Sequence, residues 1–257
     1  MNAAPILEVR SLAKSFGGVT ALDGVSFRMA PGEALAVIGP NGSGKTTLIN
    51  CISGFVRPTA GQVLFRGTDI TNLAPHRVAD RGIARTFQLM RPFHSLSTAQ
   101  NLVIPLSSSR ARRRGGWRGG GRLGDRDAVA IDILEELGFE RDSHLPRQRS
   151  GTLPTGYLKR LELGRCIALR PDVVLCDELF SGLSISETAS LVPFVERLGR
   201  QGIAFLMVGH RLREIFRLVS RVIVLARGRL IAEGTPAAVL DDAAVREAYL
   251  GSEEWTA

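Results

Sequence analysis

A buried strand, a glycine-rich turn and a helix follow one another near residue 40, and this order limits the chain to a small set of folds. Residues 34–38 are continuously apolar, as in a strand that is covered on both faces of a sheet. The next eight residues match the pattern G-x-x-x-x-G-K-[ST], and the segment that begins at Thr46 has helical character. This context is typical of a P-loop.

The residue types of the turn suit a phosphate group. Glycines let backbone N–H groups approach phosphate oxygens, since a Cβ would block that approach, and the start of the helix adds the positive end of a dipole. Lys45 supplies a point charge for the terminal phosphates, and the hydroxyl of Thr46 is a ligand for Mg²⁺. A glycine-rich turn with an incidental lysine is the alternative, but chance produces this pattern in only about one such chain in a hundred. The residues expected at the phosphates are Gly39, Pro40, Asn41, Gly42, Ser43, Gly44, Lys45, Thr46 and Thr47.

Strand and helix patterns alternate along the rest of the chain. Short apolar runs alternate with turn signals over the first forty residues, and strand-like runs return at residues 173–175, 203–208 and 222–225. Amphipathic spacing predicts helices over residues 128–138 and 158–169. The order predicts an α/β fold with a mainly parallel sheet and helices on its faces.

Two adjacent carboxylates end the strand-like run at residues 173–176. Asp177 is the natural second magnesium ligand of a P-loop protein, in the Walker B position. Glu178 is placed to orient or deprotonate an attacking water. The alternative interpretation is a carboxylate pair that caps the next helix.

His210 follows the strand-like run at residues 203–209. It therefore lies at the edge where parallel sheets bind ligands, and it is a candidate hydrogen-bond donor to the γ-phosphate. A histidine taken alone is more often structural, and the ordered set of motifs favours the functional interpretation here. His76, His94 and His144 have no such context, and we expect them to be surface or core residues.

Residues 107–124 read SSSRARRRGGWRGGGRLG and show no apolar periodicity. We interpret them as a mobile Arg/Gly-rich loop. The functional alternative is a basic arm for nucleic acid or anionic lipid headgroups, but the lone Trp117 offers little aromatic stacking.

The composition excludes several classes of protein. Hydrophobic residues make up 44 % and charged residues 23 %, which argues against global disorder and fibrous repeats. No apolar run approaches the roughly 18 residues that a membrane helix needs, and no secretory signal is visible. Cys51, Cys166 and Cys176 form no CxxC pair, which fits a reducing cytosol and disfavours a zinc site.

With these motifs in order, the chain resembles the ATP-binding subunits of ABC transporters over nearly its whole length. More narrowly, it is similar to the ATPases of branched-chain amino acid importers. Four stretches carry that closer resemblance: KSFGGVTALDGVSF from Lys14, GIARTFQ from Gly82, RPFHSLSTAQNL from Arg91 and VREAYLG from Val245.

The resemblance implies a single ABC ATPase domain over residues 1–257. Residues 1–88 and 171–257 would form the P-loop NTPase core with an N-terminal antiparallel β subdomain, and residues 89–170 an inserted α-helical subdomain. It also implies that Phe16 stacks on adenine and that Gln88 is the Q-loop glutamine, which senses Mg²⁺ and the attacking water. The alternative for Phe16 is a core phenylalanine near a turn, and the alternative for Gln88 is an ordinary polar loop residue.

The resemblance further implies ATP and Mg²⁺ as cofactors and a peripheral place on the cytoplasmic face of a bacterial membrane. The implied partners are integral-membrane permease subunits that residues 91–106 would face, a second ATPase subunit and, indirectly, a periplasmic or extracellular substrate-binding protein. Two ATPase subunits of this family sandwich two ATP molecules, each between the P-loop of one and the signature motif LSGGQ of the other.

The signature segment departs from the family pattern. Pro154 replaces the serine, Thr155 replaces a small residue, Gly156 is kept and Tyr157 replaces the glutamine. Proline at the start of a helix is acceptable, so the helix can survive, and Thr155 and Gly156 still offer contacts to a partner's nucleotide. Three further residues depart from the family pattern: Leu179, where proline usually follows Walker B, Ser184, where the D-loop usually has Asp or Asn, and Arg211, where an acidic residue commonly follows the histidine.

These observations predict an ATP-hydrolysing subunit of an importer. The set contributed in cis is complete: Lys45, Thr46, Gln88, Asp177, Glu178 and His210. The set contributed in trans is altered, which favours a heterodimer with a different ATPase over a homodimer. The alternatives are a slow or non-hydrolysing nucleotide-binding partner subunit and, on the basic segment alone, a soluble ATPase that acts on nucleic acid.

Overall fold

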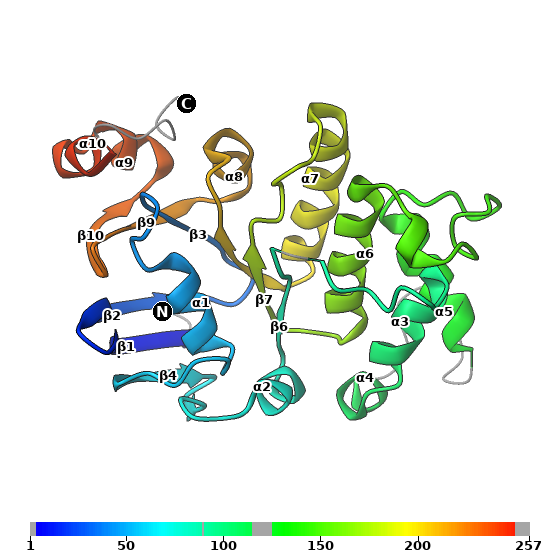
Figure 1. Ribbon diagram of the computed structural model, residues 1–257, viewed down its shortest axis with the longest axis horizontal. Coiled ribbons are helices and arrows are strands. Elements are labelled where there is room, and N and C mark those ends of the chain that lie inside the picture. The colour runs from blue at the N-terminus through cyan, green and yellow to red at the C-terminus, as the bar shows by residue number, and fades with distance from the viewer. Residues whose placement is uncertain (1–3, 89, 115–124, 250–257) are drawn as a thin grey trace.

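A six-stranded sheet forms the centre of the computed structural model, which describes residues 4–88, 90–114 and 125–249 (Figure 1). Its strand order is β10-β9-β3-β8-β7-β6, with every pair parallel except β9 and β10. The predicted mainly parallel sheet is therefore confirmed. The strands are β3 (Ala34–Ile38), β6 (Ile83–Arg85), β7 (Val173–Asp177), β8 (Ala204–Val208), β9 (Arg221–Ala226) and β10 (Arg229–Gly234).

Both faces of this sheet are buried, because alternate side chains enter two different cores. Leu35 and Val37 of β3 pack with the antiparallel sheet and the P-loop helix, whereas Ala36 and Ile38 pack with the helical side of the molecule. Strands β7, β8 and β9 divide in the same way. Because both faces of the sheet are covered, the sequences of these strands are continuously apolar.

A second sheet is antiparallel and has the order β2-β1-β4-β5. The predicted N-terminal antiparallel subdomain is thus confirmed, although its first strand extends well beyond the apolar run at residues 6–9. Gly17, with φ +58°, supports the turn between the first two strands. The strands are β1 (Leu7–Phe16), β2 (Val19–Met29), β4 (Ala60–Phe65) and β5 (Thr68–Asp69).

Helices connect the strands of the central sheet. Helix α1 follows β3, α7 joins β7 to β8, and α8 joins β8 to β9 (Figure 1). Ser184 and Glu187 begin α7 with a reciprocal capping box. Helix α2 precedes β6, and α9 and α10 follow β10. The bounds are α1 (Lys45–Ile52), α2 (Pro75–Arg81), α7 (Ile185–Arg200), α8 (Leu212–Leu218), α9 (Pro236–Asp241) and α10 (Ala243–Tyr249).

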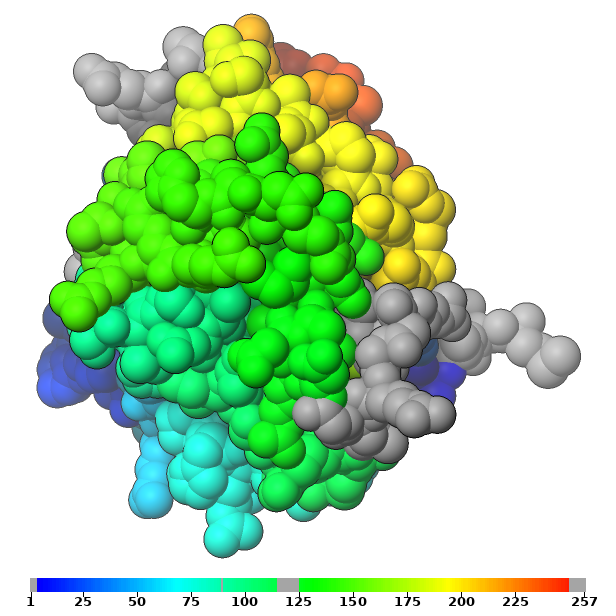
Figure 2. Space-filling view, turned by 90° about the vertical axis from the view of Figure 1, so that its right-hand side faces the viewer, coloured from blue at the N-terminus to red at the C-terminus, as the bar shows by residue number. Residues whose placement is uncertain are grey.

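Among the described residues, four further α-helices and a short 3-10 helix (Ser150–Thr152) lie between β6 and β7. The α-helices gather on one side of the molecule, where they form much of the face in Figure 2. Leu102, Ile133 and Leu163 pack into the core that they share with the sheet. The two predicted amphipathic helices are present, and each begins two or three residues earlier than expected. The helices are α3 (Thr98–Leu106), α4 (Ser109–Arg113), α5 (Arg126–Glu136) and α6 (Thr155–Ala168).

The expectation of a loop over residues 107–124 is wrong for its first part, because residues 109–113 form helix α4. Ser108 caps it, and Arg110 is only 6 % exposed. The Arg110 guanidinium donates to the Asp172 carboxylate at 2.8 Å and to the carbonyls of Arg170 and Arg81. Apolar periodicity does not reveal such a helix, because a buried ion pair anchors it. Residues 115–124, with Trp117, lie outside the described residues.

Within the described ranges, no helix is long and apolar enough to cross a membrane.

Candidate functional site

The P-loop lies between the carboxyl end of β3 and the first residue of α1. Gly39 has φ +150° and Gly44 has φ +107°. A Cβ on Gly39 would lie 2.0 Å from the Leu225 carbonyl oxygen, and one on Gly44 would lie 2.5 Å from that of Ala21. Glycine is therefore required at both ends of the loop by conformation and by space.

Polar groups converge on this turn. The Lys45 Nζ donates to the carbonyls of Gly39 and Pro40 at 2.5 and 3.0 Å, so the ammonium folds over the loop. The Ser43 hydroxyl is buried and has no hydrogen-bond partner among the described residues. A buried hydroxyl of this kind needs a partner, and a phosphate oxygen would supply one. Asn41, Gly42 and Thr46 are exposed, and Thr47 is half-buried.

Asp177 ends β7 with its side chain almost fully buried. Its Oδ2 accepts a hydrogen bond from Arg85 Nη2 at 2.9 Å, and its N–H donates to Thr86 Oγ1 at 3.2 Å. Arg85 lies in the stretch GIARTFQ, and no sequence motif assigns it a role. The contact follows from the parallel pairing of β6 with β7.

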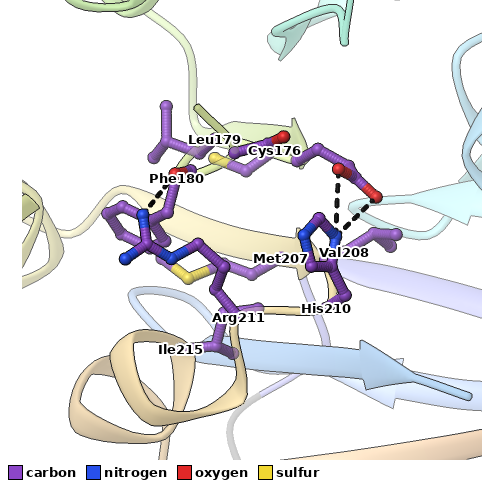
Figure 3. A pocket seen from close by; sticks show the side chains of 11 residues that line it. Cys176, Leu179, Phe180, Met207, Val208, His210, Arg211 and Ile215 are labelled. Carbon is purple, nitrogen blue, oxygen red and sulfur yellow. Dashed lines mark hydrogen bonds and ion pairs between the residues drawn. The ribbon is translucent and has the colours of Figure 1, made fainter. Parts of the chain in front are cut away.

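Glu178 and His210 form a pair at the carboxyl edge of the sheet, and dashed lines that end at His210 mark it in Figure 3. The His210 Nδ1 lies 3.2 Å from the Glu178 carboxylate, whose side chain is 19 % exposed. Glu178 has φ +55°, a conformation that costs a side-chain-bearing residue free energy and is enriched at functional sites. The Glu178 N–H donates to the Val208 carbonyl, and the buried Lys159 Nζ donates to the Glu178 carbonyl at 3.0 Å.

The apolar side chains behind this pair close a small pocket. Cys176, Met207 and Ile215 line it, and Arg211 reaches across to the Phe180 carbonyl (Figure 3). Arg211 also donates to the Leu183 carbonyl at 2.6 Å. The arginine that departs from the family pattern therefore holds the main chain that precedes α7.

Gln88 and Phe16 are exposed. Gln88 follows β6 by three residues, and no hydrogen bond joins it to another described site residue. Phe16 is 50 % exposed at the end of β1, with Lys14 Nζ 4.7 Å from its ring centre. An exposed ring suits stacking on a base, and both assignments stay predictions. His76, His94 and His144 are also exposed, as expected.

The altered signature segment begins α6, so the helix survives its proline. Pro154 occupies the N-cap position and makes no side-chain cap. Thr155 is exposed, but the Glu187 carboxylate covers Gly156, where an added Cβ would lie 1.7 Å from Glu187 Oε1. Tyr157 turns inward, with its ring centre 4.9 Å from that of Phe139.

Two buried ionisable groups on α6 lie beside the site. Burial lowers the pKa of Lys159, against the opposing effect of Glu178 and Asp177. Burial raises the pKa of Glu162, whose carboxylate contacts Arg165 and the Phe87 backbone N–H. Both shifts have desolvation as their largest cause.

The oxygen donors of the site fit magnesium. Thr46, Asp177 and Gln88 offer a hydroxyl, a carboxylate and an amide oxygen. No group of three or more His, Cys, Asp or Glu side chains that could hold a metal occurs among the described residues. Magnesium does not need one, because it usually binds through one or two carboxylates together with substrate phosphates.

Comparison with known families decides the affiliation. The ABC transporter family model matches residues 22–181, which is more than half of the chain. The chain belongs to the ABC transporter family. As a member of it, the chain is an ATP-binding, ATP-hydrolysing cassette.

The relatives cover almost the whole cassette. It is 33 % identical to the high-affinity branched-chain amino acid transport ATP-binding protein BraF of Pseudomonas aeruginosa, over 96 % of this chain and 98 % of that protein. It is 32 % identical to the corresponding protein LivG of Escherichia coli, over 96 % and 98 %. A model described as a branched-chain amino acid ATP-binding cassette transporter matches residues 229–254.

A solved structure agrees with the fold of this cassette. The ADP conformation of an ATP-binding cassette of an ABC transporter superposes with a TM-score of 0.82 at 34 % identity, over 97 % of this chain and 100 % of that one.

Proposed function

We propose that this cassette hydrolyses ATP to power a membrane importer of branched-chain or related amino acids. The observation that carries the catalytic part is the contact of 3.2 Å between Glu178 and His210 at the sheet edge beside the P-loop. The similarity to BraF and LivG supports the substrate class. We assign residues 1–88 and 171–257 to the core and 89–170 to the inserted helical subdomain.

Each residue of the site has its own role in the proposed reaction. The P-loop N–H groups, Lys45 and Ser43 bind the phosphates, and Phe16 stacks on the adenine. Glu178 orients the attacking water and accepts its proton, while His210, whose ring lies beside the Glu178 carboxylate, donates to the γ-phosphate. Thr46, Asp177 and Gln88 would hold Mg²⁺, which neutralises phosphate charge when bound.

The partners in this proposal are integral-membrane permease subunits and a second ATPase subunit, at the cytoplasmic face of the membrane. A substrate-binding protein outside the membrane would deliver the amino acid to the permease. Residues 91–106 would face the permease, and they include Phe93 and Ile104, each 44 % exposed. Exposed apolar side chains of this size are suited to an interface.

Glu178→Gln tests the catalytic assignment. We expect the variant to keep magnesium-dependent ATP binding and to lose at least about 10²-fold in hydrolysis rate, the usual contribution of a general base. Glu196→Gln, an exposed glutamate on α7, is the matched control. Hydrolysis that survives in Glu178→Gln would contradict the assignment.

Uptake by cells tests the substrate class. Deletion of the chain is expected to abolish uptake of radiolabelled leucine, isoleucine or valine, and a plasmid copy should restore it, unlike a Glu178→Gln copy. Unchanged uptake of all three, with loss of a different solute, would overturn the substrate assignment but not the ATPase.

A slow nucleotide-binding partner subunit is the second candidate. The signature segment favours it, because Pro154 offers no hydroxyl, Glu187 covers Gly156 and Tyr157 packs against Phe139. In a heterodimer, the P-loop of this chain would meet an intact signature and turn over normally, while the second site would be slow. Steady hydrolysis by the purified chain alone would contradict this asymmetry.

A further inference from the structure

Arg85 lies at the junction of three elements of the nucleotide site. It is the last residue of β6, and its side chain is 8 % exposed. Its Nη2 donates to Asp177 Oδ2 at 2.9 Å, and its Nη1 donates to Asn50 Oδ1 at 2.6 Å and to Ser53 Oγ at 3.0 Å. Asn50 lies in the last turn of α1, and Ser53 caps its end. One guanidinium therefore joins the helix that carries Thr46 to the strand that carries Asp177.

Aromatic rings fix this guanidinium in place. Its carbon lies 5.5 Å from the ring centre of Phe55 and 5.1 Å from that of Phe87. The two rings are themselves in edge contact, with centres 5.5 Å apart. A planar cation that lies against two rings and donates to three acceptors has little freedom left.

The main chain next to Arg85 continues the same network. Thr86 Oγ1 accepts the N–H of Asp177, and the Arg85 carbonyl accepts a hydrogen bond from Cys166 on α6. Gln88 follows three residues later. The position of Arg85 is thus tied to the Walker B strand, the P-loop helix, the signature helix and the Q-loop segment.

The contacts leave one oxygen of Asp177 available. Oδ2 is held by Arg85, whereas Oδ1 accepts no hydrogen bond from the described residues. Fixing Oδ2 to the end of α1 fixes the whole carboxylate relative to Thr46 at the start of α1. A magnesium site here needs the Asp177 carboxylate and the Thr46 hydroxyl at one ion. Its affinity rises when the folded chain already holds these two groups at the right distance, because the entropy of ordering them is then lost on folding and not on binding.

We propose that Arg85 is a positioning residue that presets Asp177 and the P-loop helix for magnesium-bound nucleotide. The inference rests on the proposed role of Asp177 as the magnesium carboxylate. Arg85 does not touch the nucleotide in this scheme, and it acts through Asp177, Asn50 and Ser53.

Arg85→Lys tests the proposal, since lysine keeps the charge but cannot reproduce the fork to three acceptors. The readout is the Kd of a fluorescent ATP analogue, measured with Mg²⁺ and with EDTA. We expect Arg85→Lys to weaken binding about tenfold with Mg²⁺, the equivalent of one charged hydrogen bond, and to leave the Kd in EDTA unchanged. In the Asp177→Asn background, Arg85→Lys should add less than about a twofold effect, because coupled residues are not additive.

Arg110→Lys is the matched control. Its guanidinium is as buried as that of Arg85 and also pairs with an aspartate, but that aspartate is Asp172, outside the site. An equal loss of magnesium-dependent affinity in Arg110→Lys, or equal losses in Mg²⁺ and EDTA for Arg85→Lys, would overturn the proposal. If Arg85→Lys does not fold, Asn50→Ala removes one acceptor and should show the same magnesium-selective loss to a smaller degree.

The Asp177→Asn variant distinguishes a failure of the role proposed for Asp177 from a failure of the role proposed for Arg85. If it leaves the magnesium dependence intact, the proposed role of Asp177 fails. If it removes the magnesium dependence and Arg85→Lys does not reduce it, only the role of Arg85 fails.

Discussion

Glu178 stands in a backbone conformation that its residue type rarely adopts. Three contacts keep it there: its N–H donates to Val208, and its carbonyl accepts from Lys159 and from the Ser181 N–H. The strained main chain turns the side chain away from the direction of β7 and toward His210. Because Lys159 belongs to α6, the helix that begins with the altered signature segment supports the main chain of the glutamate that we propose as the base.

Glu162 shows how the same helix responds to pH. Burial raises its pKa above the ordinary 4.5, so the folded chain binds a proton more tightly than the unfolded chain. Stability falls with rising pH wherever the folded chain binds more protons than the unfolded chain. The free energy of unfolding therefore decreases as pH rises from about 4.5 through the raised pKa of Glu162. The neutral amide of Glu162→Gln cannot titrate, so the variant should lose less stability over this range.

Urea denaturation between pH 4.5 and pH 8 measures this difference. The control is Glu196→Gln, whose exposed carboxyl should leave the pH profile as in the wild type. Parallel pH profiles for the wild type and Glu162→Gln would contradict the prediction.

At the scale of elements, patterns of polarity predicted the strands that are buried on two faces and the amphipathic helices α5 and α6. The apolar run at β3 and the G-x-x-x-x-G-K-[ST] pattern after it were enough to locate the P-loop, and a Cβ on Gly39 or Gly44 would collide with a backbone oxygen there. Helix α4 was not predicted, because its buried residue Arg110 is held by an ion pair with Asp172 and leaves no apolar periodicity in the sequence. Arg85 escaped for a related reason: its partners lie 32, 35 and 92 residues away.

The start of α6 shows the same limit. The departures at Pro154 and Tyr157 were visible in the sequence, whereas the carboxylate of Glu187 over Gly156 required the structure. Serine at position 154 would cap the helix and restore a hydroxyl, and glutamine at position 157 would give up the ring contact with Phe139.

A mixed dimer tests whether this segment limits turnover in trans. One chain carries Glu178→Gln, Pro154→Ser and Tyr157→Gln, so it cannot hydrolyse but presents a restored signature. Mixed with the wild-type chain, it should raise the ATPase rate at least about tenfold, because one lost transition-state donor costs about 10² to 10³ in rate. The control mixture uses Glu178→Gln alone. Equal rates for the two mixtures would refute the role of the signature.

At the scale of the whole molecule, Asp172 links segments that are far apart in the sequence. Its carboxylate pairs with Arg110 and Arg114 from the α4 segment and with Arg66 from the turn between β4 and β5. Asp172 precedes β7, whereas Asp177 ends it, so the five-residue strand separates this cluster from the nucleotide site. The cluster therefore holds the helical insertion to the core at the edge of the sheet opposite the P-loop.

Asp172→Asn should destabilise the chain without weakening nucleotide binding. It leaves the buried Arg110 without its counter-charge, and breaking such a pair costs about 3 kcal/mol or more. For a chain of this size that corresponds to a fall in Tm of roughly 10 °C. Calorimetry measures the Tm, and titration with a fluorescent ATP analogue measures the Kd, which should stay within about twofold of the wild type because the sites share no partners. Asp80→Asn, at an exposed aspartate, keeps an amide oxygen for the hydrogen bond from Ser109 and gives up only the loose pair with Arg113 at 3.9 Å, so it should change neither quantity. A wild-type Tm for Asp172→Asn would mean that apolar packing alone holds the insertion, and a large loss of affinity would mean that its position reaches the nucleotide site through β7.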